Sequence, residues 1–161
     1  CGLRPARVGN RRDARSGTHA VILMQGLNDR GDGLLAEARQ RLAVHLPDQL
    51  AHGLREVTPA MATRLQHGLP APDDPAAVDR ADLEAFAFGH RPLLDTHGAL
   101  ARWALRGSGA FSGADRALLD AAVDRPLDVT TMARIAGLSG RREAIARLRQ
   151  LLAQSLRTDD E

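Results

Sequence analysis

The sequence predicts an all-α protein, a helical bundle that is followed by a C-terminal unit of three helices. Leucine, alanine and valine supply most of the apolar residues in a chain that is 43% hydrophobic, and leucine and alanine favour helices. Aromatic residues make up only 2%, and the β-branched runs that would favour strands are scarce. Helix-start signals recur along the chain, and its 161 residues are enough to bury a sizeable core.

The N-terminal segment, residues 1–19, carries five arginines, one aspartate and no apolar periodicity. We expect it to be a disordered basic tail, because it has no apolar face to offset its conformational entropy. It would add nonspecific affinity for phosphate, or it is upstream sequence that is not natively translated, with Met24 near the true start. Cys1 is interpreted as the edge of a fragment or a mis-assigned start, and the alternative is the lipid-carrying N-terminus of a mature lipoprotein.

Residues 20–106 are expected to form a helical domain, which begins with the one strand-like run of the chain, residues 20–24. Apolar residues at helical spacing then predict a helix over 34–46. Pro47 should end this helix, because proline lacks the N–H and clashes with the preceding turn. Asp48 is placed to cap a short helix that follows.

Three further helices are predicted in the same domain. The Thr58-Pro59 pair is a strong helix start, a cap followed by a proline at the first helical position. The next helix covers 76–88 and should renucleate at Asp82. Asp95 or Thr96 should open the last one.

Residues 107–109 form a glycine-rich joint, and we expect a second domain over 110–158. Its first helix should be capped by Ser112, with Asp115 three residues later in a variant of the capping box. The pair Arg125-Pro126 should break this helix.

Two more helices, joined by a tight turn, are predicted in this domain. Thr130 or Thr131 should cap the first of them. Gly137 fits the left-handed residue that ends a helix, and Leu138 can fold back over the last turn. The second helix shows one apolar seam, formed by Ile145, Leu148 and Leu152.

The run from Met132 to Ser139, Met-Ala-Arg-Ile-Ala-Gly-Leu-Ser, resembles the first helix and turn of bacterial helix-turn-helix regulators, where Leu-Ala-x-x-Leu-Gly-Leu-Ser is typical. Residues 111–156 look like the trihelical core of helix-turn-helix and winged-helix domains. The resemblance implies a DNA-binding transcriptional regulator or regulatory domain, with double-stranded DNA as its partner. The alternative is a helical protein–protein interaction module with the same helix-turn-helix-like fold, which binds another protein or itself without DNA binding or catalysis.

The resemblance implies that the last helix enters the major groove. Its outward-facing arginine, glutamine and glutamate would address guanine, adenine and cytosine respectively, and hydroxyls near the helix ends would hold phosphates. Arg141 would contact DNA of every sequence alike. The predicted DNA-binding residues are Thr130, Thr131, Ser139, Arg141, Arg142, Glu143, Arg147 and Gln150.

The net charge of +2 is too small to imply a polyanion partner by itself. Residues 111–161 hold eight arginines against eight acidic residues, so the charge count does not separate the two alternatives. Every basic residue is arginine, which indicates a GC-rich bacterial genome.

Histidines suggest a metal site, since His52 and Glu56 lie one helical turn apart and His90 and His97 might converge with them. There is no second matching pair, so we expect surface histidines and no metal. No serine lies in a recognisable nucleophile turn, and we expect neither an enzyme nor a cofactor. No apolar run is long enough to span a membrane. A cytoplasmic protein is therefore expected, or a lipid-anchored one if Cys1 is processed.

Overall fold

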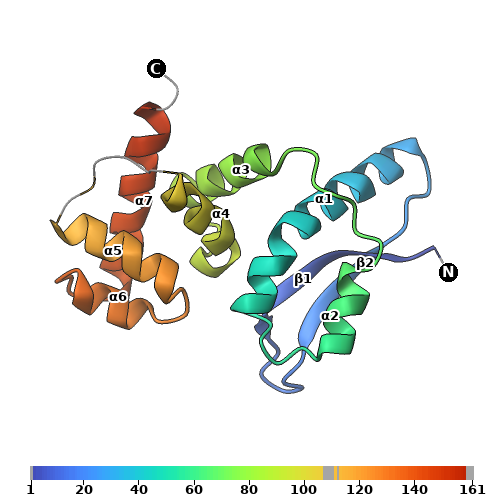
Figure 1. Cartoon of the computed structure of the whole chain (residues 1–161), viewed down its shortest axis with the longest axis horizontal. Coiled ribbons are helices and arrows are strands. Elements are labelled where there is room, and N and C mark those ends of the chain that lie inside the picture. Colours follow the sequence, from blue (N-terminus) through green and yellow to red (C-terminus); the bar gives the residue numbers. More distant parts are fainter. Residues whose placement is uncertain (1, 107–110, 112, 159–161) are drawn as a thin grey trace. The chain divides into compact units, whose positions relative to one another are not determined.

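Figure 1 shows the computed structural model of the chain, which describes residues 2–106, 111 and 113–158. Two strands and seven helices form within this part of the chain. The prediction of an all-α protein is therefore wrong, and the fold is of the α/β class. The reason is a β-hairpin near the N-terminus, whose first strand has no continuous apolar run to signal it.

The chain divides into two compact units, Cys1–Pro75 and Ala76–Glu161. The joint that the sequence predicts at 107–109, together with Cys1 and the Ser112 cap, lies outside the described residues. The proposed division of the helical part at this joint therefore stays a prediction. No helix in the described ranges is long and apolar enough to cross a membrane.

The first unit begins with the hairpin, in which β1 (Arg4–Arg12) pairs antiparallel with β2 (His19–Met24). Val8 lies opposite Val21 in the register. Alternate side chains of β1 are buried (Ala6, Val8 and Asn10), and Arg7 and Gly9 lie between them. The segment that the sequence analysis expects to be a disordered tail thus contains a strand with one buried face.

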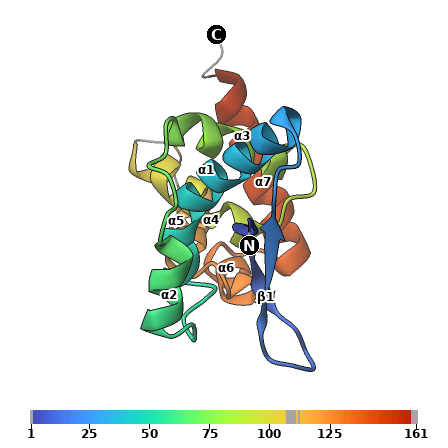
Figure 2. The same ribbon diagram turned by 90° about the vertical axis from the view of Figure 1, so that its right-hand side faces the viewer.

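The hairpin turn projects past the helices of its unit (Figures 1 and 2). The Asp13 carboxylate accepts hydrogen bonds from the backbone N–H groups of Ser16 at 2.8 Å and Arg15 at 3.0 Å. These bonds, the one from Ser16 first, lower the pKa of Asp13. Gly17 supplies the left-handed residue of the turn, with a φ of 64°.

Helix α1 (Asp29–Ala51) starts at Asn28, whose side chain accepts from the Gly31 N–H at 2.9 Å. The prediction that Pro47 ends this helix is wrong, because α1 continues through it. Leu42 and Leu46 are buried together with Leu54 in the core of the unit, and this packing offsets the backbone bond that proline cannot make.

Helix α2 (Pro59–Gln66) confirms the predicted start at the Thr58-Pro59 pair. The Thr58 hydroxyl accepts from the Met61 N–H at 3.3 Å, and Pro59 occupies the first turn. Leu65 of α2 and Val8 of β1 complete the small core that α1 begins.

In its described residues, the second unit contains helices joined by turns and no strand. Its elements are α3 (Pro75–Ala87), α4 (Leu93–Leu105), α5 (Gly113–Asp124), α6 (Val129–Ile135) and α7 (Arg141–Thr158). One continuous core joins them, and its largest fully buried side chains include Phe86, Leu100, Met132 and Leu148. The apolar seam predicted for α7 is confirmed, since Leu148 and Leu152 are buried and Ile145 packs against the core.

Two helix starts in this unit differ from the prediction. Asp82 does not renucleate α3 but is fully buried and ion-paired with Arg91, 3.2 Å away. Helix α4 begins at Leu93 after Pro92, without a side-chain cap, and neither Asp95 nor Thr96 opens it. The Thr96 hydroxyl instead donates back to the Pro92 carbonyl at 3.0 Å.

Helices α3 and α4 are joined by a buried carboxylate. Asp79 is 0% exposed and accepts from Arg102 through both oxygens, at 2.6 Å from Nη2 to Oδ1 and 3.0 Å from Nε to Oδ2. Arg106 adds a longer contact of 3.6 Å. A buried charge is tolerated only when it is paired in this way. Arg102 therefore stabilises the fold through its bonds to Asp79.

Candidate nucleic-acid interface

The start of α6 is fixed by Asp128. Its carboxylate accepts from the Thr131 backbone N–H at 2.9 Å, and hydrogen bonding by Thr131 lowers the pKa of Asp128. The prediction that Thr130 or Thr131 caps this helix is therefore wrong. A carboxylate one turn before the expected hydroxyl does the capping, and Thr130 lies exposed in the first turn.

The turn after α6 is confirmed in detail. Gly137 has a φ of 67°, in the left-handed region. The Leu138 N–H donates to the Ala133 carbonyl at 2.8 Å, and the Gly137 N–H donates to the Arg134 carbonyl at 3.2 Å. These two bonds form the Schellman motif, so the backbone between α6 and α7 is closed by its own hydrogen bonds.

Glu143 closes the start of α7. One of its carboxylate oxygens accepts from both the backbone N–H and the hydroxyl of Ser139, each at 2.6 Å. These bonds lower the pKa of Glu143. The side chain that the helix-turn-helix resemblance assigns to reading a base is therefore engaged within the turn.

Arg147 is also engaged within the unit. Its guanidinium donates to both carboxylate oxygens of Asp115 on α5, at 2.7 Å each, and a third bond of 3.4 Å reaches the Gln150 side chain. The bond from Arg147 lowers the pKa of Asp115 and raises that of Arg147 itself. This pair ties α7 to α5, and the predicted outward-pointing Arg147 and Gln150 are instead bonded to protein groups.

Four arginines around this turn remain exposed. In the ranges that the structure describes, none of them forms an ion pair with a carboxylate. Arg125 and Arg134 lie close enough to Asp128 to lower its pKa, after the larger effect of Thr131. We call Arg125, Arg134, Arg141 and Arg142 the α6–α7 arginine cluster.

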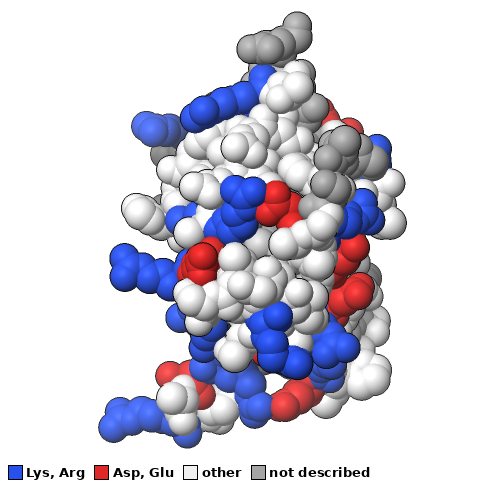
Figure 3. Space-filling view, turned by 90° about the vertical axis from the view of Figure 1, so that its left-hand side faces the viewer, with Lys and Arg blue, Asp and Glu red and all other residues white. Residues whose placement is uncertain are grey.

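Two other arginines of the second unit contrast with this cluster. Arg80 and Arg116 bind carboxylates one helical turn away, at 2.9 Å each. Figure 3 looks onto the side of this unit that carries α5 and α6, where acidic side chains are interspersed with the basic ones. The net charge of the unit therefore says little about which arginines are available, because several of its carboxylates are bonded to particular arginines.

Of the predicted site residues, only Arg141 and Arg142 belong to the α6–α7 arginine cluster. Arg125 and Arg134 were missed because the helix-turn-helix resemblance assigns contacts to the last helix and to hydroxyls near the helix ends. A usable signal was present, since Arg134 lies in the last turn of the short helix α6 and Arg125 lies a few residues before that helix.

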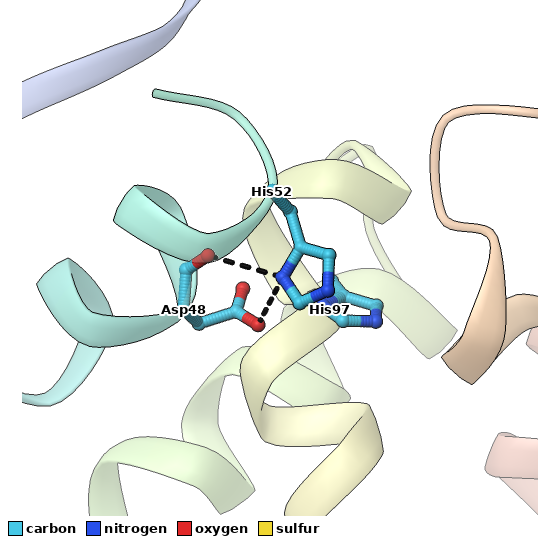
Figure 4. A group of neighbouring side chains, drawn as sticks. All are labelled: Asp48, His52 and His97. Atoms are coloured by element: carbon cyan, nitrogen blue, oxygen red, sulfur yellow. Dashed lines mark hydrogen bonds and ion pairs between the residues drawn. The ribbon is translucent and has the colours of Figure 1, made fainter. Parts of the chain in front are cut away.

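Within the first unit, His52 and Glu56 do not form the pair that the sequence suggested. His52 lies beside Asp48, with its Nδ1 3.0 Å from a carboxylate oxygen and 3.1 Å from the backbone carbonyl (Figure 4). Glu56 instead pairs with Arg12 at 2.5 Å. His90 is exposed, and His97 of the second unit is buried with its Nε2 2.8 Å from the Val123 carbonyl.

Comparisons with known proteins identify the family. Residues 31–161 match the family described as tRNA-binding domain. The tRNA(Met) cytidine acetyltransferase TmcA of Salmonella typhimurium is 34% identical over 156 residues, which are 97% of this chain and 21% of that protein. The enzyme of the same name from Nitrosococcus halophilus is 44% identical over 89 residues, 54% of this chain and 12% of that protein. The Citrobacter koseri enzyme is 30% identical over 162 residues, all of this chain and 22% of that protein.

These matches correct the functional prediction. The three helices α5, α6 and α7 occur in the predicted order, but they belong to a different family from the helix-turn-helix regulators. Neither transcription regulation through double-stranded DNA nor the alternative of a protein-interaction module is supported, and RNA is the polymer indicated. The chain spans only 12% to 22% of the length of these relatives. It belongs to the tRNA-binding domain family.

Proposed function

We propose that this chain binds tRNA through the α6–α7 arginine cluster. The observation that carries the proposal is a set of four exposed arginines, none of which forms an ion pair with a carboxylate of the described residues, whereas Arg80 and Arg116 of the same unit do. Guanidinium groups bind phosphate oxygens through two parallel hydrogen bonds, and phosphate contacts supply most of the affinity for a nucleic acid.

The backbone around the cluster is fixed before any ligand arrives. The Asp128 cap, the left-handed Gly137 and the Ser139–Glu143 bonds hold the ends of α6 and α7 in place. A rigid scaffold loses less conformational entropy on binding, so contacts of the same strength give higher affinity. Glu143, Arg147 and Gln150 contribute to this rigidity rather than to base recognition.

Within the cluster, Arg141 keeps the sequence-independent contact that the resemblance implied, now toward RNA, and the exposed Arg142 next to it takes a phosphate-binding role instead of reading a base. Thr130, exposed in the first turn of α6, adds a hydroxyl donor near the cluster, whereas Ser139 and the Thr131 N–H are already bonded to Glu143 and Asp128. Binding at such a surface follows the shape of the RNA backbone rather than its base sequence, as is usual for structured RNA.

The three relatives are cytidine acetyltransferases of tRNA(Met), and the chain matches a minor share of each. We propose that this segment holds the tRNA substrate of a protein of that kind and performs no chemistry itself. We also propose that the protein is cytoplasmic, which agrees with a tRNA ligand.

The test compares two double variants of the 161-residue chain in filter binding to a tRNA(Met) transcript. Arg141→Ala/Arg142→Ala removes two members of the cluster, whereas Arg80→Ala/Arg116→Ala removes two arginines that are paired with carboxylates. Both variants lose the same formal charge. We expect the first to weaken binding about tenfold or more and to flatten the salt dependence by about one in slope per arginine.

The paired-arginine variant should stay within about threefold of the parent chain, because its arginines face protein carboxylates. Equal losses in both variants would show that only net charge matters and that the cluster is not the binding surface. Failure of the parent chain to prefer tRNA over duplex DNA of equal charge would contradict the proposed function itself.

A further inference from the structure

The second unit exposes one aromatic ring. Phe88, directly after α3, is 55% exposed. The chain has only three phenylalanines, one tryptophan and no tyrosine. Phe86 and Trp103 are buried in the core, and Phe111 packs against the core with its ring 6.1 Å from that of Trp103. An exposed ring in a chain so poor in aromatic residues calls for an explanation.

An arginine lies over this ring. The guanidinium carbon of Arg157, in the last turn of α7, is 5.7 Å from the centre of Phe88. Arg157 is exposed and, among the described residues, forms no ion pair. Its charge is therefore available to an anion while its flat face is held against the ring.

A second pair of the same kind fixes the segment that carries Phe88. Arg149, two turns earlier on α7, lies 5.0 Å from the centre of the buried Phe86 ring. Its guanidinium also donates to the Gly89 carbonyl at 2.8 Å and to the Arg91 carbonyl at 3.4 Å. The chain from Phe88 to Arg91 is thereby held against α7.

Two further contacts make this segment rigid. Arg91 is bonded to the buried Asp82 at 3.2 Å and to the Asp95 carbonyl at 2.8 Å. A side chain at Gly89 would place a Cβ only 2.6 Å from the Ala85 carbonyl oxygen, so the turn needs glycine. Phe88 is therefore a preorganised ring and not a side chain at the tip of a mobile loop.

We infer that Phe88 and Arg157 form a stacking platform for one unpaired base of the tRNA, an inference that rests on the proposed function. Single-stranded nucleotides are recognised by stacking on aromatic rings and on arginine planes, next to cations that meet the backbone. The pair supplies all three elements: a ring that is 55% exposed, a guanidinium plane that lies over it, and a positive charge. The other strongly exposed apolar side chains of this unit, such as Leu105 and Leu127, have no π-face to offer a base.

The test uses the 161-residue chain with three RNA probes. These are a tRNA(Met) transcript, a single-stranded octamer that carries 2-aminopurine, and a fully paired RNA duplex. The variants are Phe88→Leu, which keeps the apolar volume without the ring, Phe88→Trp, which restores a ring, and Arg157→Met. Leu105→Ala is the matched control, because it shortens an apolar side chain that is 85% exposed.

We expect Phe88→Leu to lower affinity for the octamer and the transcript about tenfold, within the range for losing one base–aromatic stack. It should also abolish most of the quenching of 2-aminopurine. Phe88→Trp should bind like the parent chain, Arg157→Met should show a loss for both single-stranded and folded RNA, and the control should show none. Affinity for the duplex should change less than twofold in the Phe88 variants.

Equal binding of the octamer and the transcript by Phe88→Leu and the parent chain would overturn the inference. A loss that Phe88→Trp fails to restore would also overturn it, since it would indicate a structural role. If Phe88→Leu changes only the self-association of the chain, measured by sedimentation, Phe88 lies in a contact between protein molecules and the inference is wrong. The proposed function survives these outcomes as long as Arg141→Ala/Arg142→Ala still weakens tRNA binding.

Discussion

Arg147 and Asp115 meet through two parallel hydrogen bonds of 2.7 Å, one to each carboxylate oxygen, which join α7 to α5. The side chains are only 38% and 29% exposed. Arg147 lies on the helix that presents Arg141 and Arg142, yet three of its five N–H donors are bonded to protein groups. We therefore treat Arg147 as part of the frame of the second unit.

Replacing Arg147 with methionine is expected to lower the free energy of unfolding by about 0.5–1.5 kcal/mol, because a bidentate, partly buried pair exceeds an ordinary surface pair. Affinity for tRNA should change less than threefold. Urea unfolding followed by circular dichroism and filter binding measure the two quantities. A tenfold loss of affinity with unchanged stability would place Arg147 on the RNA instead.

The same pair predicts a pH dependence. Hydrogen bonding from Arg147 lowers the pKa of Asp115, so the stabilisation is fully present above the ordinary aspartate pKa of about 4 and is lost as pH falls through the lowered value. The stability difference between the parent chain and Asp115→Asn should thus be constant from pH 7 to pH 5 and should shrink below about pH 4. A difference that persists unchanged at pH 2.5 would contradict this linkage.

The buried carboxylate of Asp79 predicts an asymmetry between two alanine variants. Arg102→Ala leaves a fully buried carboxylate with only the longer 3.6 Å contact to Arg106, and about 3–5 kcal/mol of stability should be lost. Asp79→Ala leaves an arginine whose side chain is one third exposed, so water can solvate it and the loss should be about 2–3 kcal/mol. Unfolding curves in urea compare the two, and the reverse order would refute the argument.

Packing of the N-terminal hairpin is tested at Val8, which is 2% exposed and contacts the core of the first unit. Val8→Ala is expected to cost about 1–2 kcal/mol through lost burial and the cavity left behind. Val21→Ala, opposite Val8 in the register but 43% exposed, should cost less than about 0.5 kcal/mol. Thermal unfolding measures the stability of the two variants. Equal, negligible losses of stability would show that residues 4–12 are not packed against the core and form a tail.

Local signals in the sequence located most helices of this protein. The Thr58-Pro59 start, the left-handed Gly137 and the seam of α7 all follow from rules that act within a few residues. The hairpin was not predicted, because β1 buries only small or polar side chains at alternate positions, and the arginines around them suggest a solvated tail. The position of Pro47 inside α1 was not predicted, because the long-range packing of this helix outweighs the local effect of a helix-breaking residue.

The candidate site was harder to predict, because exposure of an arginine depends on carboxylates distant in sequence. Arg147 and Asp115 are 32 residues apart, and nothing in either neighbourhood signals the pairing. A helical projection places both Arg142 and Arg147 off the apolar seam, although one is exposed and the other is bonded to α5. Sequence periodicity therefore gave the face of α7 but not which of its cations are available.

The closed turn between α6 and α7 has a kinetic meaning. Because its backbone bonds exist in the free protein, no ordering step has to precede the encounter with an RNA. In the proposed complex with tRNA, long-range attraction to Arg141 and Arg142 governs how fast the complex forms, and ionic strength slows this step. Short-range contacts, such as a base resting on Phe88, govern how long the complex lasts. The rate of association thus depends on Arg141 and Arg142, and the lifetime of the complex depends on Phe88. Each of these two rates can change without the other.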